Sequence, residues 1–249
     1  MLLAGRDELA GGTWIGITKT GRFAALTNIR EPNTSVTKVS DPSLETDRLK
    51  SRGDLTRLFL AGTQSCEDYL MSVIDEQHSH QKSRQKNNHK SYLPIYAGFN
   101  LLVGEFTGEQ QSLCYLNNRE EGFQTLTAGI YGLSNHRLNT PWPKVSNGKQ
   151  ALEKVLANKS ESISSANHES IRRVLENPAL AADKDLPKTG LSYEKEKALS
   201  ASFIKTPLYG TRTSTVITIK NEQAEFSEKN YSPNAYEKNS SKSFMMTFS

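Results

Sequence analysis

The chain has 249 residues, of which 35% are hydrophobic and 23% are charged, a composition typical of soluble globular proteins. No apolar run is long enough to cross a membrane, and the first residues lack the basic, apolar and small-residue order of a signal peptide. The net charge of +4 is small, and the one basic cluster, at residues 82–90, has no interleaved aromatic residue. We therefore expect a cytoplasmic protein with no transmembrane segment and no nucleic-acid partner.

Hairpins and helices alternate in the first half of the chain. The predicted segments are a hairpin of 14–18 and 23–28, a loop at 31–47, helices at 54–61 and from residue 65, a flexible polar insert at 78–92, and a second hairpin of 99–106 and 113–117. The helix from residue 65 has a clear start, because Ser65 and Asp68 form a capping-box pattern ahead of an apolar face that includes Tyr69 and Leu70.

Short strands and two helices are predicted in the second half. The predicted segments are strands at 123–126, 130–133, 213–220 and 224–226 with a turn at 221–223 between the last two, helices at 149–156 and 170–175, loops at 178–192 and 231–242, and an edge strand at 243–248. We expect Asn167 or His168 to cap the second of these helices. Because the strand connections are short and hairpin-like, the pattern predicts antiparallel sheets in one α+β domain over residues 1–249, with a loose segment at 231–242.

Side chains that could bind a metal are few and badly spaced. Cys66 and Cys114 match no metal or redox motif, so we predict reduced, half-buried thiols. His78, His80 and His89 fall in the polar insert, where a solvated loop is favoured over ordered metal ligands. We predict no metal site.

Four motifs place polar residues at the ends of strand-like runs. They are Gly11–Gly16 leading to Asn28, Ala97–Leu102, Tyr131–Asn135 leading to Thr140–Lys144, and Tyr209–Thr213. Amide and guanidinium donors at one rim of a sheet can hold a carbonyl, a carboxylate or an oxyanion. The sequence therefore predicts a binding rim where these strand ends meet.

The same motifs, in this order, resemble the NRDE family, which includes the transport and Golgi organisation 2 proteins. The resemblance rests on Gly-Gly-Thr-Trp at 11–14, Gly-Leu-Ser-Asn at 132–135, Thr-Pro-Trp at 140–142 and Tyr-Gly-Thr-Arg at 209–212. It covers the chain from about Leu3 to about Phe226. The forms Thr-Pro-Trp-Pro-Lys at 140–144 and Leu-Pro-Lys-Thr-Gly at 186–190 look more like bacterial members of the family.

The resemblance implies a four-layer αββα sandwich similar to N-terminal-nucleophile hydrolases. Family members typically begin Met-Cys and then carry an Asn-Arg-Asp-Glu motif, whereas this chain starts Met-Leu-Leu-Ala-Gly-Arg-Asp-Glu. The Arg6–Glu8 triplet precedes Gly11-Gly12-Thr13-Trp14, so it matches a second family motif further along. We expect the sandwich to be incomplete at the N-terminus by a few dozen residues, with a sheet edge exposed. An N-terminal nucleophile needs its own α-amine as base, so we assign no catalytic residue.

The family also suggests which rim residues contact a ligand. Asn28 and Asn135 match active-site asparagines of related cysteine acylases, and Arg212 matches a late arginine near the nucleophile. The structural alternative is that both asparagines cap strands or fix turns and that Arg212 forms an ion pair. Trp14 and Trp142 are predicted as core or pocket wall. His136 is a candidate pocket base or axial ligand, or a surface residue of the turn.

Two functions remain open from the sequence, besides a folding-impaired remnant with no biochemical role. The first is a non-hydrolytic cytoplasmic protein for ligand binding or trafficking, in which a haem or acyl-type apolar anion is held by Asn28, Asn135 and Arg212. Its partner would be a small-molecule or lipid-like ligand, and the family implies roles in lipid homeostasis. The alternative is a cysteine amidohydrolase whose N-terminal nucleophile is missing from this chain.

Overall fold

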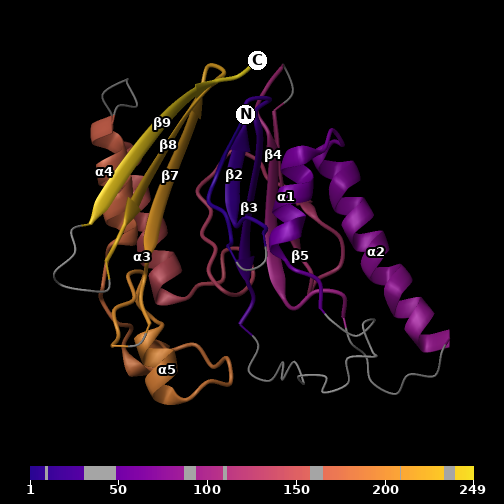
Figure 1. Cartoon of the computed structure of the whole chain (residues 1–249). Coiled ribbons are helices and arrows are strands. Elements are labelled where there is room, and N and C mark those ends of the chain that lie inside the picture. Colours follow the sequence, from indigo (N-terminus) through magenta and orange to yellow (C-terminus); the bar gives the residue numbers. More distant parts are fainter. Residues whose placement is uncertain are drawn as a thin grey trace. The chain divides into compact units, whose positions relative to one another are not determined.

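The computed structural model describes residues 1–8, 11–30, 49–86, 94–108, 111–157, 165–207, 209–232 and 239–249. The chain divides into two compact units, coloured along the sequence in Figure 1. The first unit comprises Met1–Thr127, Asn135–Arg137 and Phe248–Ser249, and the second comprises Ala128–Ser134 and Leu138–Thr247. The predicted loop at 31–47 lies outside the described residues.

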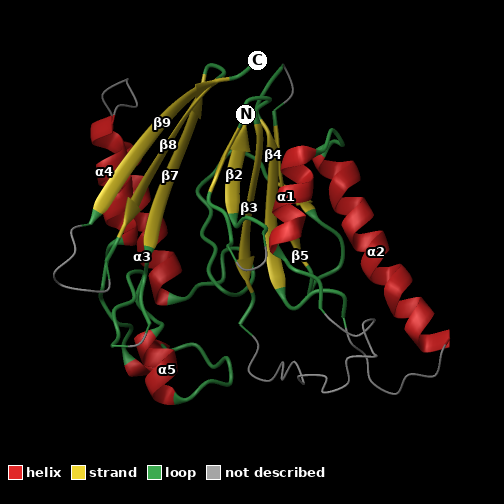
Figure 2. Ribbon diagram, in the orientation of Figure 1, coloured by secondary structure: helices red, strands yellow, loops and turns green. Residues whose placement is uncertain are grey.

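The first unit is built on a six-stranded antiparallel sheet whose strands follow one another in chain order. The strands are β1 (Leu2–Ala4), β2 (Ile15–Thr18), β3 (Arg22–Asn28), β4 (Phe99–Glu105), β5 (Ser112–Asn117) and β6 (Gln124–Thr125). The helices are α1 (Gly53–Ala61) and α2 (Cys66–Lys86), drawn in red in Figure 2. Both predicted hairpins and both helix starts are confirmed, whereas β1 was not predicted.

Side chains along the central strands point alternately to the two faces of this sheet, and one of these faces is buried under the helices. Ala24 and Leu26 on β3 lie opposite Val103 and Leu101 on β4, so their side chains share one face. These residues belong to the main hydrophobic core together with buried residues of both helices, including Phe59, and Cys66. The opposite face is mixed, with apolar side chains such as Phe23 and Leu102 and a polar cluster around Asn100 that is described with the candidate site.

The start of α2 is correct in the prediction, but its length is not. Ser65 Oγ accepts a hydrogen bond of 3.0 Å from the Asp68 backbone N–H, and it donates to the Asp68 carboxylate at 2.8 Å. The helix then continues to Lys86, so residues 78–86 of the predicted flexible insert are helical and the rest of the insert lies outside the described residues. This stretch contains no glycine or proline and is rich in Gln, Lys and Arg, which favour helix despite their polarity.

The second unit contains a three-stranded antiparallel sheet and helices of its own. The strands are β7 (Thr213–Lys220), β8 (Gln223–Asn230) and β9 (Ser240–Thr247), and the helices are α3 (Pro143–Ala157), α4 (Ser165–Leu175), a 3₁₀ turn (Asp183–Asp185) and α5 (Tyr193–Ala198). The β7–β8 turn has positive φ at Asn221 (48°) and Glu222 (59°), the geometry of a two-residue type I′ hairpin. The predicted hairpin and the predicted edge strand are confirmed.

Several predicted boundaries in the second unit are wrong. Residues 130–133 form no strand, because Asn139 takes up the backbone groups of Gly132 through bonds of 2.7 and 3.0 Å. The helix predicted at 149–156 begins at Pro143, where a proline suits the first turn. Asn167 and His168 lie inside α4 and do not cap it.

Further corrections concern segments that were predicted as irregular. α5 was not predicted at all, although Ser192 caps it through a bond from the Lys195 backbone N–H. Residues 240–242 of the predicted loose segment belong to β9, where pairing with β8 orders them. Residues 233–238 of that segment lie outside the described part of the chain.

Mixed helix and strand content with two antiparallel sheets confirms the predicted α+β class. The four-layer stacking of the two sheets and the grouping of the whole chain into one domain stay predictions. Among the described helices, none is both long and apolar enough to cross a membrane.

Candidate functional site

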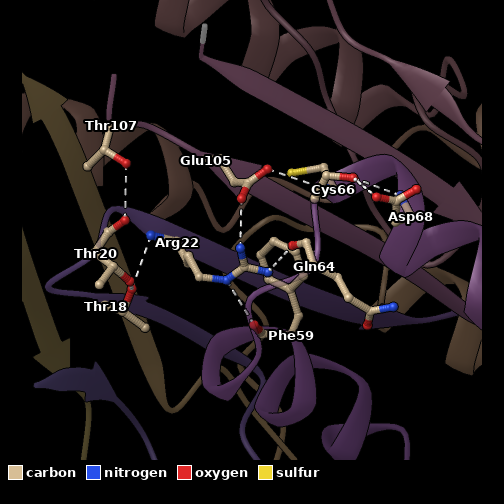
Figure 3. A network of polar contacts seen from close by, with 10 residues as sticks. Thr18, Thr20, Arg22, Phe59, Gln64, Cys66, Asp68, Glu105 and Thr107 are labelled. Carbon is tan, nitrogen blue, oxygen red and sulfur yellow. Dashed lines mark hydrogen bonds and ion pairs between the residues drawn. The ribbon is translucent and has the colours of Figure 1, made fainter. Parts of the chain in front are cut away.

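A buried arginine ties the helices of the first unit to its sheet. Arg22 on β3 uses all three guanidinium nitrogens, as Figure 3 shows. Nε donates to the Phe59 carbonyl at 3.0 Å, Nη2 to the Gln64 carbonyl at 2.7 Å, and Nη1 to the Glu105 carboxylate at 2.7 Å. The other oxygen of Glu105 accepts the Cys66 backbone N–H at 3.1 Å, at the start of α2. Every group in this network is satisfied within the protein, so its role is structural.

The two cysteines are free thiols, as predicted, but they are fully buried rather than half-buried. Burial is the main cause that raises the pKa of Cys66 to about 12, and burial also raises the pKa of Cys114. Because the thiolate is the nucleophile, thiols in this environment are unreactive near neutral pH. Neither cysteine is a candidate catalytic group.

The face of the first sheet away from the helices carries a polar cluster organised around Asn100, which is completely buried. Its amide group donates to Thr27 Oγ1 at 3.1 Å and to the His136 carbonyl at 2.8 Å. Its Oδ1 accepts the Tyr115 hydroxyl at 2.7 Å and the Asn117 amide at 3.0 Å. All four bonding positions of the Asn100 side chain are used, so this residue anchors the sheet and is not available to a ligand.

Two of the predicted rim residues lie together beside this network. Asn135 donates from its side-chain amide to the backbone carbonyl of Asn28 at 3.0 Å, and its own carbonyl accepts the Arg30 N–H at 2.9 Å. These bonds hold residues 135–137 against the end of β3, which supports the structural alternative for Asn135. Asn28 Oδ1 is buried and accepts no hydrogen bond from the part of the chain that the structure describes. Ligand contacts of Asn28, Asn135 and the half-buried His136 stay predictions.

The two tryptophans have different environments. Trp14 in the first unit is 40% exposed, so it is not a core residue. Trp142 in the second unit is half-buried, and its carbonyl accepts the backbone N–H groups of Val145 and Ser146 at the start of α3. The Lys144 ammonium lies 6.0 Å from the centre of its ring. A pocket-wall role for either tryptophan stays a prediction.

Arg212, the third predicted rim residue, lines a pocket of about 480 Å³ in the second unit. We call this cavity the Arg212 pocket. Its aromatic wall is Phe203 and Tyr231, whose rings meet edge to face with centroids 4.8 Å apart. Tyr209 also lines it and is 63% exposed. Because Asn28 and Asn135 belong to the other unit, whether they share one rim with Arg212 stays a prediction.

Lys205 and Arg212 belong to a tight hairpin loop that forms one side of this pocket. Ile204 and Thr211 are joined by two bonds of 2.9 Å, and Thr206 Oγ1 accepts the Tyr209 N–H at 3.0 Å. Glycine suits position 210, since a Cβ there would make a tight contact of 3.0 Å with the Ile204 carbonyl oxygen. The Tyr-Gly-Thr-Arg motif therefore shapes the loop that carries Arg212.

The Glu176 carboxylate holds Tyr231, which is part of the aromatic wall of the Arg212 pocket. Glu176 accepts the Tyr231 hydroxyl at 2.6 Å and the Lys229 ammonium at 2.8 Å, and the bond from Lys229 is the largest cause of its lowered pKa. Burial, followed by the bond to Glu176, raises the pKa of Tyr231 to about 12. The Tyr231 phenol is therefore neutral and anchored, whereas no bond engages the Tyr209 hydroxyl among the described residues.

Two cations, Lys205 and Arg212, line this pocket. In the part of the chain that the structure describes, no aspartate or glutamate lines it with them. Within the described residues, neither side chain takes part in an ion pair or a side-chain hydrogen bond. A guanidinium and an ammonium beside an apolar wall can bind an anion that carries an apolar body.

The second unit also buries charged groups between α4 and its sheet. His168 is 2% exposed, and its Nε2 lies 2.9 Å from Thr218 Oγ1. Its Nδ1 lies 3.5 Å from the Glu225 carboxylate. Burial is the main cause that lowers the pKa of His168, and Arg172 adds to it while Glu225 opposes it. This cluster joins helix to sheet and is separate from the residues that line the Arg212 pocket.

Sequence reasoning found Arg212 through the Tyr-Gly-Thr-Arg motif but missed Lys205, Phe203 and Tyr231. Lys205 precedes the motif by four residues, and only the hairpin loop brings it beside Arg212. Tyr231 lies after β8 and reaches the pocket through a bond of 2.8 Å from its N–H to the Arg212 carbonyl. The one available signal was an aromatic residue, Phe203, six residues before the motif.

Comparison with known proteins connects these features to a family. The family model described as Transport and Golgi organisation 2 matches residues 1–233. A Transport and Golgi organization protein 2 homolog of Bos taurus is 32% identical over 214 residues, which cover 84% of this chain and 68% of the relative. The Homo sapiens homolog is 31% identical over the same shares, and the Mus musculus homolog is 30% identical over 88% of this chain and 72% of its own length. All three relatives are mammalian, so the resemblance to bacterial members stays a prediction.

Proposed function

Because the chain belongs to the Transport and Golgi organisation 2 family, we propose that it binds a planar organic dianion such as haem in the Arg212 pocket. The observation that carries this proposal is the pair of cations, Arg212 and Lys205, that line one cavity in which no carboxylate is found among the described lining residues. Their charges are balanced by no ion pair within the described residues. A ligand with two carboxylates would supply both missing partners.

The walls of the pocket favour a planar ligand over a flexible acyl chain. Phe203 and Tyr231 offer a fixed aromatic surface, and Tyr209 adds an exposed ring on the hairpin loop. Rings of this kind stack on extended π-systems. The volume of about 480 Å³ lies within the range of roughly 300–1,000 Å³ that is usual for small-molecule sites.

The residues present fit haem as a cargo. Arg212 and Lys205 would pair with the two propionates, and the Tyr209 phenol is the side chain that could ligate the iron, since tyrosine serves as a haem ligand in some proteins. Tyr231 is unsuited to that role because its hydroxyl is bound to Glu176. The lining contains no histidine, cysteine or methionine.

Binding without hydrolysis suits the chemistry of the described residues. The two thiols are buried and their pKa values are raised, so they supply no nucleophile to the pocket. A role in transport, which the names of the relatives suggest, would follow if the protein carries its ligand between compartments. This role and a cytoplasmic location are part of the proposal.

The proposal is tested by titrating the purified protein with haem and following the Soret absorption band. We expect Arg212→Ala and Lys205→Ala each to weaken haem binding about tenfold, because each removes one charge-assisted contact to a carboxylate. Lys184→Ala, an exposed cation elsewhere in the second unit, should bind haem like the original protein. Equal affinity in all four proteins would refute the assignment.

The role of Tyr209 is tested separately from charge pairing. We expect Tyr209→Phe to shift the Soret band of bound haem, while its affinity for iron-free protoporphyrin IX stays unchanged. A Soret band identical to that of the original protein would remove Tyr209 as the iron ligand and leave the carboxylate contacts standing.

A further inference from the structure

The Glu176 carboxylate connects the aromatic wall of the Arg212 pocket to a nearby cation. One of its oxygens, Oε1, accepts both the Tyr231 hydroxyl at 2.6 Å and the Lys229 ammonium at 2.8 Å. Tyr231 is among the described residues that line the pocket, and Glu176 and Lys229 are not. The ion pair of Glu176 and Lys229 is therefore linked to the pocket through the Tyr231 side chain.

This ion pair lies close to the pocket wall and is largely shielded from solvent. The side chains of Glu176 and Lys229 are 23% and 22% exposed, and the Lys229 ammonium lies 5.5 Å from the centre of the Tyr231 ring. The bond from Lys229, followed by the bond from Tyr231, lowers the pKa of Glu176, so its carboxylate is ionised at neutral pH. Because solvent screens charges in such a place only in part, each of them influences a ligand several ångströms away.

The residues that follow α4 also hold the second ring of the wall. The Asn177 carbonyl accepts the Phe203 N–H at 2.9 Å, and Phe203 meets Tyr231 edge to face. Glu176 and Asn177 are neighbours in the chain, so one short segment fixes both rings. A substitution of Glu176 that keeps an acceptor for the Tyr231 hydroxyl can therefore change the charge beside the wall while the wall itself stays in place.

The cations near the wall that do not line the pocket are both paired with carboxylates. Arg172 lies near Glu176 and contributes to its lowered pKa after the two bonds above, but it is itself paired with Glu169. Lys229 is paired with Glu176. Within the described residues, the cations without a carboxylate partner at this pocket are therefore the two that line it.

We propose that Glu176 is a positioning residue that makes the Arg212 pocket selective for dianions over ligands with more carboxylates, by holding Tyr231 and cancelling the charge of Lys229. This inference rests on the proposed function and extends it from the class of ligand to the number of carboxylates that the ligand carries. Without the Glu176 carboxylate, Lys229 would add a third positive charge beside the wall. A ligand with four carboxylates gains more from that charge than a ligand with two.

The selectivity is tested with two iron-free porphyrins, protoporphyrin IX with two carboxylates and coproporphyrin III with four, by fluorescence titration. We expect Glu176→Gln to raise the affinity for coproporphyrin III relative to that for protoporphyrin IX about fivefold. The glutamine keeps an oxygen that accepts the Tyr231 hydroxyl. A substitution that only disturbed packing would change both affinities by the same factor, so an unchanged ratio overturns the proposal.

Variants of Lys229 test whether the effect passes through its charge. Lys229→Gln alone leaves the Glu176 carboxylate unpaired, so the ratio should shift about fivefold toward protoporphyrin IX. The double variant Glu176→Gln, Lys229→Gln removes both charges and should restore the ratio of the original protein. Glu194→Gln, which changes an exposed carboxylate of α5, is the matched control and should leave the ratio unchanged. A double variant that keeps the ratio of Glu176→Gln contradicts the role of Lys229 and overturns the proposal.

Failure of this inference can be told apart from failure of the proposed function. If the original protein binds neither porphyrin, the Arg212 pocket is no site for such anions, and both are refuted. If the original protein binds protoporphyrin IX and Arg212→Ala weakens that binding, the proposed function stands. An unchanged ratio of affinities in Glu176→Gln then refutes the selectivity role of Glu176 alone.

Discussion

Arg22 in the first unit and Arg212 in the second show two opposite uses of a guanidinium. The Arg22 side chain is 8% exposed, stacks on the Phe59 ring at 3.9 Å, and bonds to two carbonyls and one carboxylate. Arg212 is exposed and has no side-chain partner among the described residues. The first arginine completes the fold, whereas the second leaves its charge available to a ligand.

The difference between the contacts of these two arginines indicates which charged residues of this chain to examine for function. Buried polar groups cost free energy unless they are paired, so the network of Arg22 and Glu105 exists because the fold satisfies it. An exposed cation without a described partner contributes little to folding, and in the proposed function its partner is a ligand. The predictions below test this division, beginning with the largest expected effect.

Arg22→Ala should lower the free energy of unfolding by about 3–5 kcal/mol, because it leaves the half-buried Glu105 carboxylate without its cation and two backbone carbonyls without their donor. Chemical denaturation in urea, followed by circular dichroism, measures the loss. A matched control is Arg57→Ala, which removes an exposed pair with Asp54 and should change stability by less than about 1 kcal/mol. Similar losses in the two variants would contradict the structural role of Arg22.

Asn100→Leu should lower the free energy of unfolding by about 2–3 kcal/mol, because it leaves the buried partners Tyr115 and Asn117 short of an acceptor. Asn28→Ala should cost much less, since Oδ1 of Asn28 accepts no described hydrogen bond. The same urea titration compares the two. Equal costs would show that Asn28 has a structural role that its contacts do not reveal.

Stability should fall as the pH drops from 7.5 to 5.5, by less than the two substitutions above remove. The pKa of His168 is lowered in the folded state by burial, so the unfolded chain takes up its proton first, near pH 6.5, and unfolding is favoured below that pH. Arg172 and Glu225 are the charged groups that face it. In His168→Gln the pH dependence of the melting temperature should be shallower, and an unchanged slope would contradict this origin.

Arg212→Ala should change the free energy of unfolding by less than about 0.5 kcal/mol, the smallest effect in the series. A small change in the free energy of unfolding for Arg212→Ala and a large one for Arg22→Ala would together support the different roles of the two arginines. If Arg212→Ala instead unfolds the second unit, its haem phenotype would have a structural cause, and the assignment would rest on Lys205→Ala alone.

Sequence patterns predicted those helices and turns that are determined by residues close together in the chain. The cap at Ser65 and the turn at Asn221 were readable because the residues that form them are close in sequence. The strand expected at 130–133 failed because its backbone groups are taken by Asn139, a side chain with no propensity signal. The helix through residues 78–86 was missed because its polar composition resembles that of a loop.

The residues of the candidate site likewise fall into those that the sequence predicted and those that it did not. Arg212 could be predicted because it ends a motif, and its lack of a described counter-charge became visible only with the surrounding contacts. Lys205 could not be predicted, because it lies outside the motif and only the hairpin loop brings it beside Arg212. Asn28 and Asn135 lie next to each other, and the bond between them goes to a backbone carbonyl, while their place on one rim with Arg212 stays a prediction.

The burial of Cys66 and Cys114 gives the first unit a built-in reporter of its own opening. With both sulfur atoms closed off from solvent, electrophiles such as iodoacetamide reach them only when the helices part from the sheet. The rate of alkylation therefore measures how often the helices of the first unit separate transiently from its sheet. Oxidative damage to these thiols in a cell would likewise be confined to molecules that have already begun to unfold.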